Sequence, residues 1–237
     1  MLNNISKYTS PIEQAEALAT SVASQLIEAI ELKGRAILAV AGGQTPALFF
    51  EHLSRCELNW SKVVITTTDE RFVPQDSSRS NARLVAENLL INKAAAATFL
   101  ALCDSEETPE LCAKNASSKI SNLLPLDVCV LGMGADMHIA SLFPDTPGLN
   151  EAISVDFPHL VLPMTPPTAD EVRLTLTLPV LMGAKNLHIL IVGSDKLDAL
   201  NHSETIKSVI KAPVKSVLMH KMLQICLLYT SPSPRDS

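Results

Sequence analysis

An aspartate and a histidine two positions apart, Asp136 and His138, are the strongest candidates for catalytic chemistry in this chain. They follow the apolar run 128–131, which predicts a buried strand, and two glycines, Gly132 and Gly134, which permit a tight turn. A histidine at the carboxyl end of a strand can transfer a proton near neutral pH. For this motif alone, an exposed histidine in a turn closed by Asp136 is the commoner explanation.

A second candidate site is formed by Gly42, Gly43, Gln44 and Thr45, which join the predicted strand 36–41 to a predicted helix. Two glycines let a ligand approach the backbone closely, and the free N–H groups at the start of a helix favour a phosphate group. We expect Thr45 to cap that helix. The segment is neither a Walker loop nor a dinucleotide-binding fingerprint, and an ordinary strand–helix turn explains it equally well.

Three cations are candidates for holding an anionic substrate: Arg71, Arg173 and Lys196. Arg71 follows the predicted strand 63–67 and Lys196 follows the predicted strand 187–192. In a doubly wound sheet, ligands bind at the carboxyl ends of such strands. Arginine can grip a phosphate with two hydrogen bonds, whereas lysine acts as a point charge. Taken singly, each is better explained as a surface charge, and Arg71 as a partner of an adjacent carboxylate.

The order of predicted elements indicates the fold that must position these residues. Strands alternate with helices, which predicts a single α/β domain with a Rossmann-like, doubly wound, mostly parallel sheet and helices on both faces. Pro11 and Gly34 mark the ends of the first helix, and Ser80 or Asn81 caps the third. The predicted strands are 36–41, 63–67, 127–131, 160–162 and 187–192, and the predicted helices are 11–33, 45–53, 80–90, 105–122, 177–184 and 195–201.

The end of the chain has a different composition from the rest. Residues 227–237 change abruptly to a Ser/Pro-rich segment that resembles a translated cloning adapter. We therefore predict that the folded domain spans 1–226 and that 227–237 form a non-native or disordered tail.

Composition and charge limit the function classes. The 237 residues have a net charge of −6, which argues against nucleic acid or an anionic membrane as a partner. No apolar run approaches the roughly 20 residues of a transmembrane helix, and the N-terminus lacks the build of a signal peptide, so we expect a cytoplasmic protein. The five cysteines, an odd number with no C-x-x-C pair, are expected to be reduced thiols, and the scattered histidines suggest no metal site.

Taken together and in their order, these segments resemble the 6-phosphogluconolactonase family, which has G-G-x-T-P, D-E-R, G-x-G-x-D-G-H-x-A-S-L-F-P, R-x-T and G-x-x-K segments. The resemblance covers roughly residues 10–225, and the collinear set is far more specific than any single motif. One departure is Met137, where the family usually has glycine. If this position needs a positive φ, Met137 strains the loop or displaces His138.

The resemblance implies hydrolysis of 6-phospho-D-glucono-1,5-lactone to 6-phospho-D-gluconate, a step of the oxidative pentose phosphate pathway. The partner would be a phosphorylated sugar lactone, with no cofactor or metal. His138 would be the general base on water, and Arg71 would stabilise the oxyanion. Asp136 would orient the imidazole ring or help to place the substrate. The glycine-rich segment, Arg173 and Lys196 would hold the phosphate.

Two alternatives stay open. The related glucosamine-6-phosphate isomerase/deaminases usually have N-E-P where residues 141–144 of this chain are Ser-Leu-Phe-Pro, which disfavours that activity. The other alternative is a non-catalytic sugar-phosphate sensor, which would bind substrate without turning it over. The sequence does not predict an oligomeric state.

Overall fold

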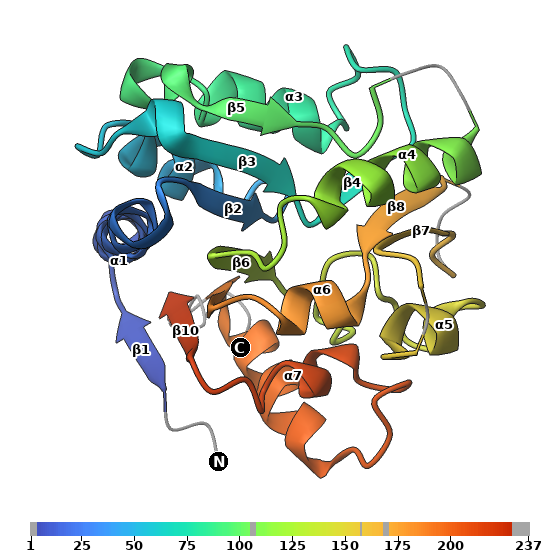
Figure 1. Cartoon of the computed structure of the whole chain (residues 1–237). Helices are drawn as coiled ribbons and strands as arrows, with labels where there is room; N and C mark the ends of the chain where they lie inside the picture. The colour runs from blue at the N-terminus through green and yellow to red at the C-terminus, as the bar shows by residue number, and fades with distance from the viewer. Residues whose placement is uncertain (1–3, 105–107, 157, 168–170, 229–237) are drawn as a thin grey trace.

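A seven-stranded sheet, parallel throughout, forms the centre of the computed structural model, which describes residues 4–104, 108–156, 158–167 and 171–228 (Figure 1). Its strand order is β1-β10-β9-β6-β2-β3-β5, and every neighbouring pair runs in the same direction. The strands are β1 (Ile5–Tyr8), β2 (Ala36–Val40), β3 (Val63–Thr67), β5 (Thr98–Leu100), β6 (Val128–Gly132), β9 (Asn186–Val192) and β10 (Leu223–Leu228).

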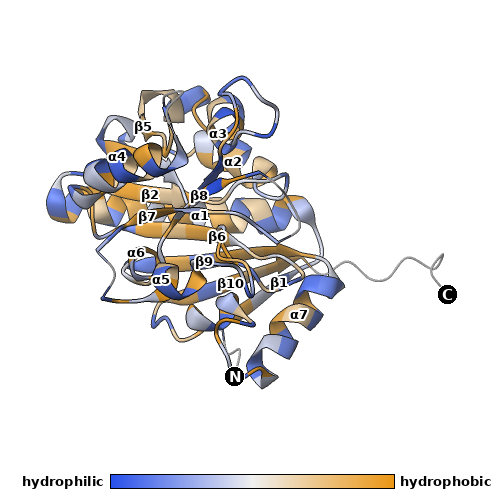
Figure 2. Cartoon of the chain, turned by 90° about the vertical axis from the view of Figure 1, so that its right-hand side faces the viewer, coloured by the Kyte–Doolittle hydropathy of each residue, from blue (hydrophilic) through white to orange (hydrophobic). Residues whose placement is uncertain are grey.

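Helices cover both faces of this sheet, which confirms the predicted Rossmann-like, doubly wound architecture. Strand β2 illustrates the reason, since Leu38 and Val40 pack in one apolar cluster and Ile37 and Ala39 in the other. Figure 2 shows the apolar strands at the centre of the molecule and the hydrophilic segments toward its outside, and the described chain forms one domain. One layer holds α1 (Pro11–Lys33), α2 (Ala47–Ser54) and α3 (Asn81–Asn88), and the other holds α4 (Pro109–Ser121), α5 (Leu149–Ile153), α6 (Leu178–Met182) and α7 (Ser194–Thr205).

Short 3-10 helices complete the described chain: η1 (Trp60–Lys62), η2 (Asn92–Ala96) and η3 (Pro213–Ser216). Among the described residues, no helix is both long and apolar enough to cross a membrane.

Local sequence signals set the ends of the helices. Ser10 Oγ accepts a hydrogen bond from the Glu13 N–H ahead of α1, and Gly34 ends that helix at φ 78°. Ser80 caps α3 in the same way. The expected cap by Thr45 is wrong: Pro46, in a helical conformation at φ −81°, is the N-cap residue of α2, and no side chain caps the helix. The helix begins at Ala47, so the Thr45 hydroxyl does not cap it.

A second, smaller sheet was only partly predicted. It is antiparallel and has the order β4-β8-β7, with β4 (Asp69–Arg71), β8 (Arg173–Leu176) and β7 (Val161–Met164). The sequence indicated only the third of these, because three- and four-residue strands carry little periodic signal. The pairing places Arg71 directly opposite Arg173.

A C-terminal strand that was not predicted extends into the predicted tail. Strand β10 continues to Leu228 and pairs with β1 on one side and β9 on the other, so Leu227 and Leu228 belong to the sheet rather than to the predicted tail. Their burial between the helical layers explains the extension. The rest of the predicted tail, residues 229–237, lies outside the described residues.

The expectation of five reduced cysteines is wrong for one pair. Cys103 and Cys112 form a disulfide bond, with their Cα atoms 5.1 Å apart. The loop after β5 lies beside the first turn of α4, and the nine-residue separation of these cysteines gave no sign of that. Cys56, Cys129 and Cys226 are free thiols.

Candidate active site

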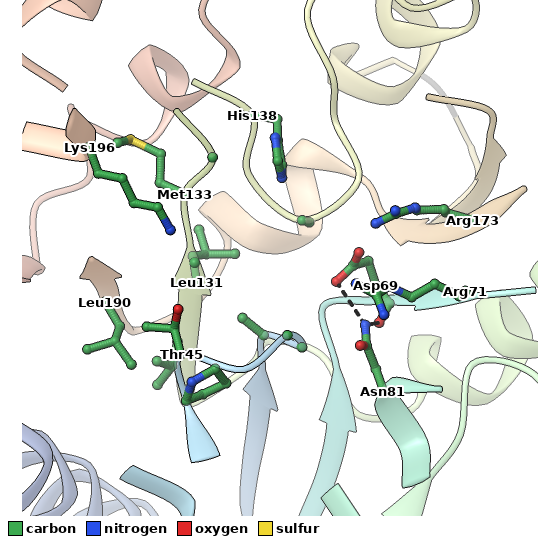
Figure 3. Close-up of a pocket in the computed structure, with 18 residues that line it drawn as sticks. Thr45, Asp69, Arg71, Asn81, Leu131, Met133, His138, Arg173, Leu190 and Lys196 are labelled. Carbon is green, nitrogen blue, oxygen red and sulfur yellow. Dashed lines mark hydrogen bonds between the residues drawn. The ribbon is translucent and has the colours of Figure 1, made fainter. Parts of the chain in front are cut away.

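A cavity of about 210 Å³ opens where β2 and β6 lie side by side. Here the sheet reverses its winding, since β3 and β5 follow β2 toward one edge while β9 and β10 follow β6 toward the other. Ligands of doubly wound folds bind at this position. Figure 3 shows the residues that line the cavity: Ala41, Gly42, Gly43, Thr45, Pro46, Asp69, Arg71, Asn81, Val130, Leu131, Gly132, Met133, Gly134, His138, Ala140, Arg173, Leu190 and Lys196.

Seven of the nine predicted site residues are in this lining, and two are not. Gln44 is exposed and lies outside the cavity. Asp136 also lies outside it, but contacts His138, which lines the cavity. Figure 3 shows His138, Lys196 and Arg173 projecting toward one space from three different elements.

The loop after β6 fixes the imidazole ring of His138. The Nδ1 atom of His138 lies 2.5 Å from Asp136 Oδ1, and the same oxygen accepts the His138 backbone N–H at 3.2 Å. Burial alone would raise the pKa of Asp136, but the hydrogen bond and charge of His138 outweigh burial and lower it. The carboxylate therefore stays ionised, and a neutral ring that donates from Nδ1 has its lone pair on Nε2.

The backbone of this loop adopts the conformation that the usual family glycine would favour. Met137 has φ 69°, a positive value that strains the backbone of a residue other than glycine. Three hydrogen bonds hold the turn: Met137 N–H to Gly134 O, Gly134 N–H to His138 O, and Val214 N–H to Met137 O, each 3.0 Å long. The last of these ties the loop to η3. Met137 does not move His138 out of the cavity.

Lys196 and the glycine-rich segment form one end of the site. The Lys196 side chain is half-buried, and within the described part of the chain no ion pair or hydrogen bond neutralises its ammonium group. A side chain at Gly42 would overlap the Asn81 amide, and Gly43 has φ 84°, so this close backbone path requires glycine at both positions. The free cation and the open backbone suit an anionic group.

The two arginines form the other end of the site. Arg71 and Arg173 are cross-strand neighbours, and in the described structure the buried Nε atom of each lacks a hydrogen-bond partner. Burial, and then the charge of Arg71, lowers the pKa of Arg173. Like charges directly opposite each other destabilise a sheet, and an anion bound between them would relieve the repulsion.

The alternative of a surface ion pair for Arg71 does not hold. Its guanidinium Nη1 donates to Arg79 O at 2.6 Å, and the neighbouring carboxylate of Glu70 is used elsewhere. Glu70 accepts the backbone N–H groups of Asn81 at 2.7 Å and Ala82 at 2.6 Å, at the start of α3. Burial raises the pKa of Glu70 in spite of these bonds. Glu70 thus fixes α3 beside the cavity.

Two lining residues with polar side chains, Asp69 and Asn81, were not among the predicted site residues. Asp69 is only 6% exposed, and its Oδ2 accepts the Ser141 hydroxyl at 2.6 Å. Asn81 Nδ2 donates to Asp69 O at 2.8 Å. Asp69 belongs to the D-E-R segment of the family resemblance, and Asn81 was predicted as a possible helix cap. Local sequence patterns could not reveal their contacts, which join residues 12 and 72 positions apart.

Comparison with known proteins identifies the family. Residues 9–225 match the family model described as glucosamine-6-phosphate isomerases/6-phosphogluconolactonase. The chain belongs to this family. It is 45% identical over 219 residues to a 6-phosphogluconolactonase of Rhizobium meliloti, covering 92% of this chain and 94% of that protein. It is 41% identical over 210 residues to one from Pseudomonas aeruginosa, covering 88% of each chain. A crystal structure of a 6-phosphogluconolactonase from Shewanella baltica has a TM-score of 0.90 and 34% identity, covering 96% of this chain and 97% of that one.

In this member of the glucosamine-6-phosphate isomerase/6-phosphogluconolactonase family, one cavity combines an oriented imidazole with three cations. The arrangement can accept a proton at one atom while it holds an anionic substrate. No group of three or more His, Cys, Asp or Glu side chains that could hold a metal ion occurs within the described ranges.

Proposed function

We propose that this chain hydrolyses 6-phospho-D-glucono-1,5-lactone to 6-phospho-D-gluconate, as a step of the oxidative pentose phosphate pathway. One observation carries the proposal: a histidine oriented by a carboxylate lines the same cavity as three cations. The curated relatives described above, at 45% and 41% identity, are 6-phosphogluconolactonases. A phosphorylated lactone fits this site, because the cations can bind its phosphate group and the imidazole can activate a water molecule to attack its ester carbonyl.

In the proposed reaction, His138 Nε2 removes a proton from a water molecule as the water oxygen attacks the lactone carbonyl carbon. The carbonyl oxygen becomes an oxyanion, which Arg71 stabilises. The ring carbon–oxygen bond then breaks, and the proton on His138 passes to the ring oxygen to give the free hydroxyl group. Asp136 holds Nδ1 throughout and balances the charge of the imidazolium. The new carboxyl group ionises in solution.

The phosphate group is held by Lys196, Arg173 and the segment of Gly42, Gly43 and Thr45. The ammonium and guanidinium groups supply charge, and the glycine backbone lets the phosphate approach closely. Gln44 was included in the predicted phosphate site, but its side chain is exposed and lies outside the cavity, so we assign it no contact with substrate.

The deaminase alternative is less well supported by the same site. In the segment where the deaminases usually have N-E-P, this chain has Leu-Phe-Pro, and Phe143 of that segment packs against the imidazole of His138 without supplying a carboxylate. An acid that assists sugar-ring opening would have to come from another part of the chain.

The test is lactone turnover, measured by coupling the product to 6-phosphogluconate dehydrogenase and subtracting spontaneous hydrolysis. We expect turnover well above the spontaneous rate, and no ammonia from glucosamine 6-phosphate. Binding of the lactone without turnover would instead identify a sensor, and release of ammonia would identify a deaminase.

A further inference from the structure

We infer that Phe143 is a positioning residue that holds the imidazole of His138 and the guanidinium of Arg173 against a single aromatic ring. The inference deepens the proposed function and rests on it, because it concerns the general base and a substrate-binding cation of that site.

The ring of Phe143 contacts both groups. Its ring centroid lies 4.4 Å from that of His138, with 37° between the planes. The Arg173 guanidinium carbon lies 5.4 Å from the same centroid, over the ring. Both distances are within the range in which an aromatic face attracts a neighbouring ring or cation.

Phe143 acts through these neighbours and not on substrate. It is 6% exposed and is not one of the residues that line the cavity, whereas His138 and Arg173 both line it. Asp136 holds the imidazole only at its Nδ1 edge, and a small rotation about the Cβ–Cγ bond of His138 would redirect Nε2 while keeping that hydrogen bond. The packing of Phe143 against the ring removes this freedom and fixes the direction of Nε2.

The ring also serves two cations in the proposed reaction. When His138 takes a proton from water, an imidazolium forms while Arg173 already carries a charge. The negative face of an aromatic ring stabilises a cation placed over it. Loss of the ring should therefore affect both the chemical step, through His138, and the binding of the phosphorylated ligand, through Arg173.

The test compares Phe143→Leu with Phe99→Leu, the same substitution on β5, outside the cavity. We measure kcat for the lactone, the Kd of 6-phosphogluconate by calorimetry, and the 15N resonances of the His138 ring. Phe143→Leu should lower kcat about tenfold and raise Kd about threefold, as expected for contacts of this kind. The 15N resonances of the His138 ring should broaden as the ring samples more than one orientation, while Asp136 keeps the proton on Nδ1. Phe99→Leu should change none of these.

Phe143→Tyr keeps the ring and should retain kcat and Kd within about threefold of wild type, provided thermal unfolding shows a native fold. A kcat for Phe143→Leu within twofold of Phe99→Leu, or His138 ring resonances as sharp as in the wild type, would overturn the inference. Absence of lactone turnover by the wild type would refute the proposed function instead. The ring resonances and product binding would then still decide whether Phe143 positions the two side chains.

Discussion

Substitution of Gly134 by alanine tests how finely the site positions its base. A Cβ atom at this position would lie closer than 3.0 Å to the ring of His138 and to the carboxylate of Asp136. Ordinary contact begins near 3.4 Å, so the imidazole has to move by about 1 Å or turn away. Gly134 is thus required by the space that the base occupies.

The size of the effect follows from this displacement. A misplacement of about 1 Å in a catalytic group costs about 100-fold in rate. Stability should change much less, by about 1–2 kcal/mol, because the atoms that must move are the ends of side chains and not backbone. Gly134→Ala should therefore fold, bind 6-phosphogluconate, and lose about 100-fold in kcat.

Gly132→Ala is the matched control, two residues earlier at the end of β6. Among the described residues, chain neighbours aside, only the Ala41 Cβ lies within 4 Å of the added Cβ, at 3.8 Å, so the loss of kcat should stay within about threefold. The assay is coupled lactone turnover at saturating substrate, with the free energy of unfolding from denaturant titration. Equal losses in the two variants, or a Gly134→Ala enzyme with wild-type kcat, would refute the steric reasoning.

Further substitutions probe individual roles. His138→Ala should lower kcat by about 10²–10⁴-fold in a folded protein, and near wild-type turnover would eliminate it as the base. Lys196→Ala and Arg173→Ala should each reduce the preference for the phosphorylated lactone over gluconolactone; an unchanged preference in both would argue against phosphate binding. Met137→Gly removes strain of roughly 1 kcal/mol at φ 69°, so its kcat should equal or exceed wild type, and a less active enzyme would contradict that account. Burial lowers the pKa of His188 to about 4, so the unfolded chain binds its proton first as pH falls below 6.5. The free energy of unfolding should therefore fall by up to about 3 kcal/mol between pH 6.5 and 4, and a His188→Asn variant should show a flatter dependence.

The larger elements were predictable because their signals are local. Helix α1 carries its own cap, proline and terminal glycine, and the apolar runs of β2, β3, β6 and β9 are long enough to indicate strands. Parallel strands also place their carboxyl ends at one edge of the sheet, so residues that follow them in sequence were expected to meet. Gly43, His138 and Lys196 do meet there.

The remaining features depend on contacts between distant segments. The pairing of Arg71 with Arg173 joins residues about 100 positions apart, through strands too short to recognise. Nothing in a D-E-R segment reveals that Glu70 is buried at the start of α3 while Arg71 faces a cavity. The prediction of the α2 cap was wrong for a related reason. Whether Thr45 or Pro46 is the N-cap residue depends on the direction in which the preceding turn leads the chain.

The facing pair of Arg71 and Arg173 has a consequence for the end of the catalytic cycle. In the proposed reaction the neutral lactone group becomes a carboxylate, while the phosphate is unchanged. The product therefore carries one more negative charge than the substrate. Two half-buried guanidinium groups attract the product more strongly than the substrate for that reason. The same positive charge that attracts the substrate therefore slows release of the acid. Accumulated 6-phosphogluconate should inhibit the enzyme, so its rate depends on the reaction that removes this acid.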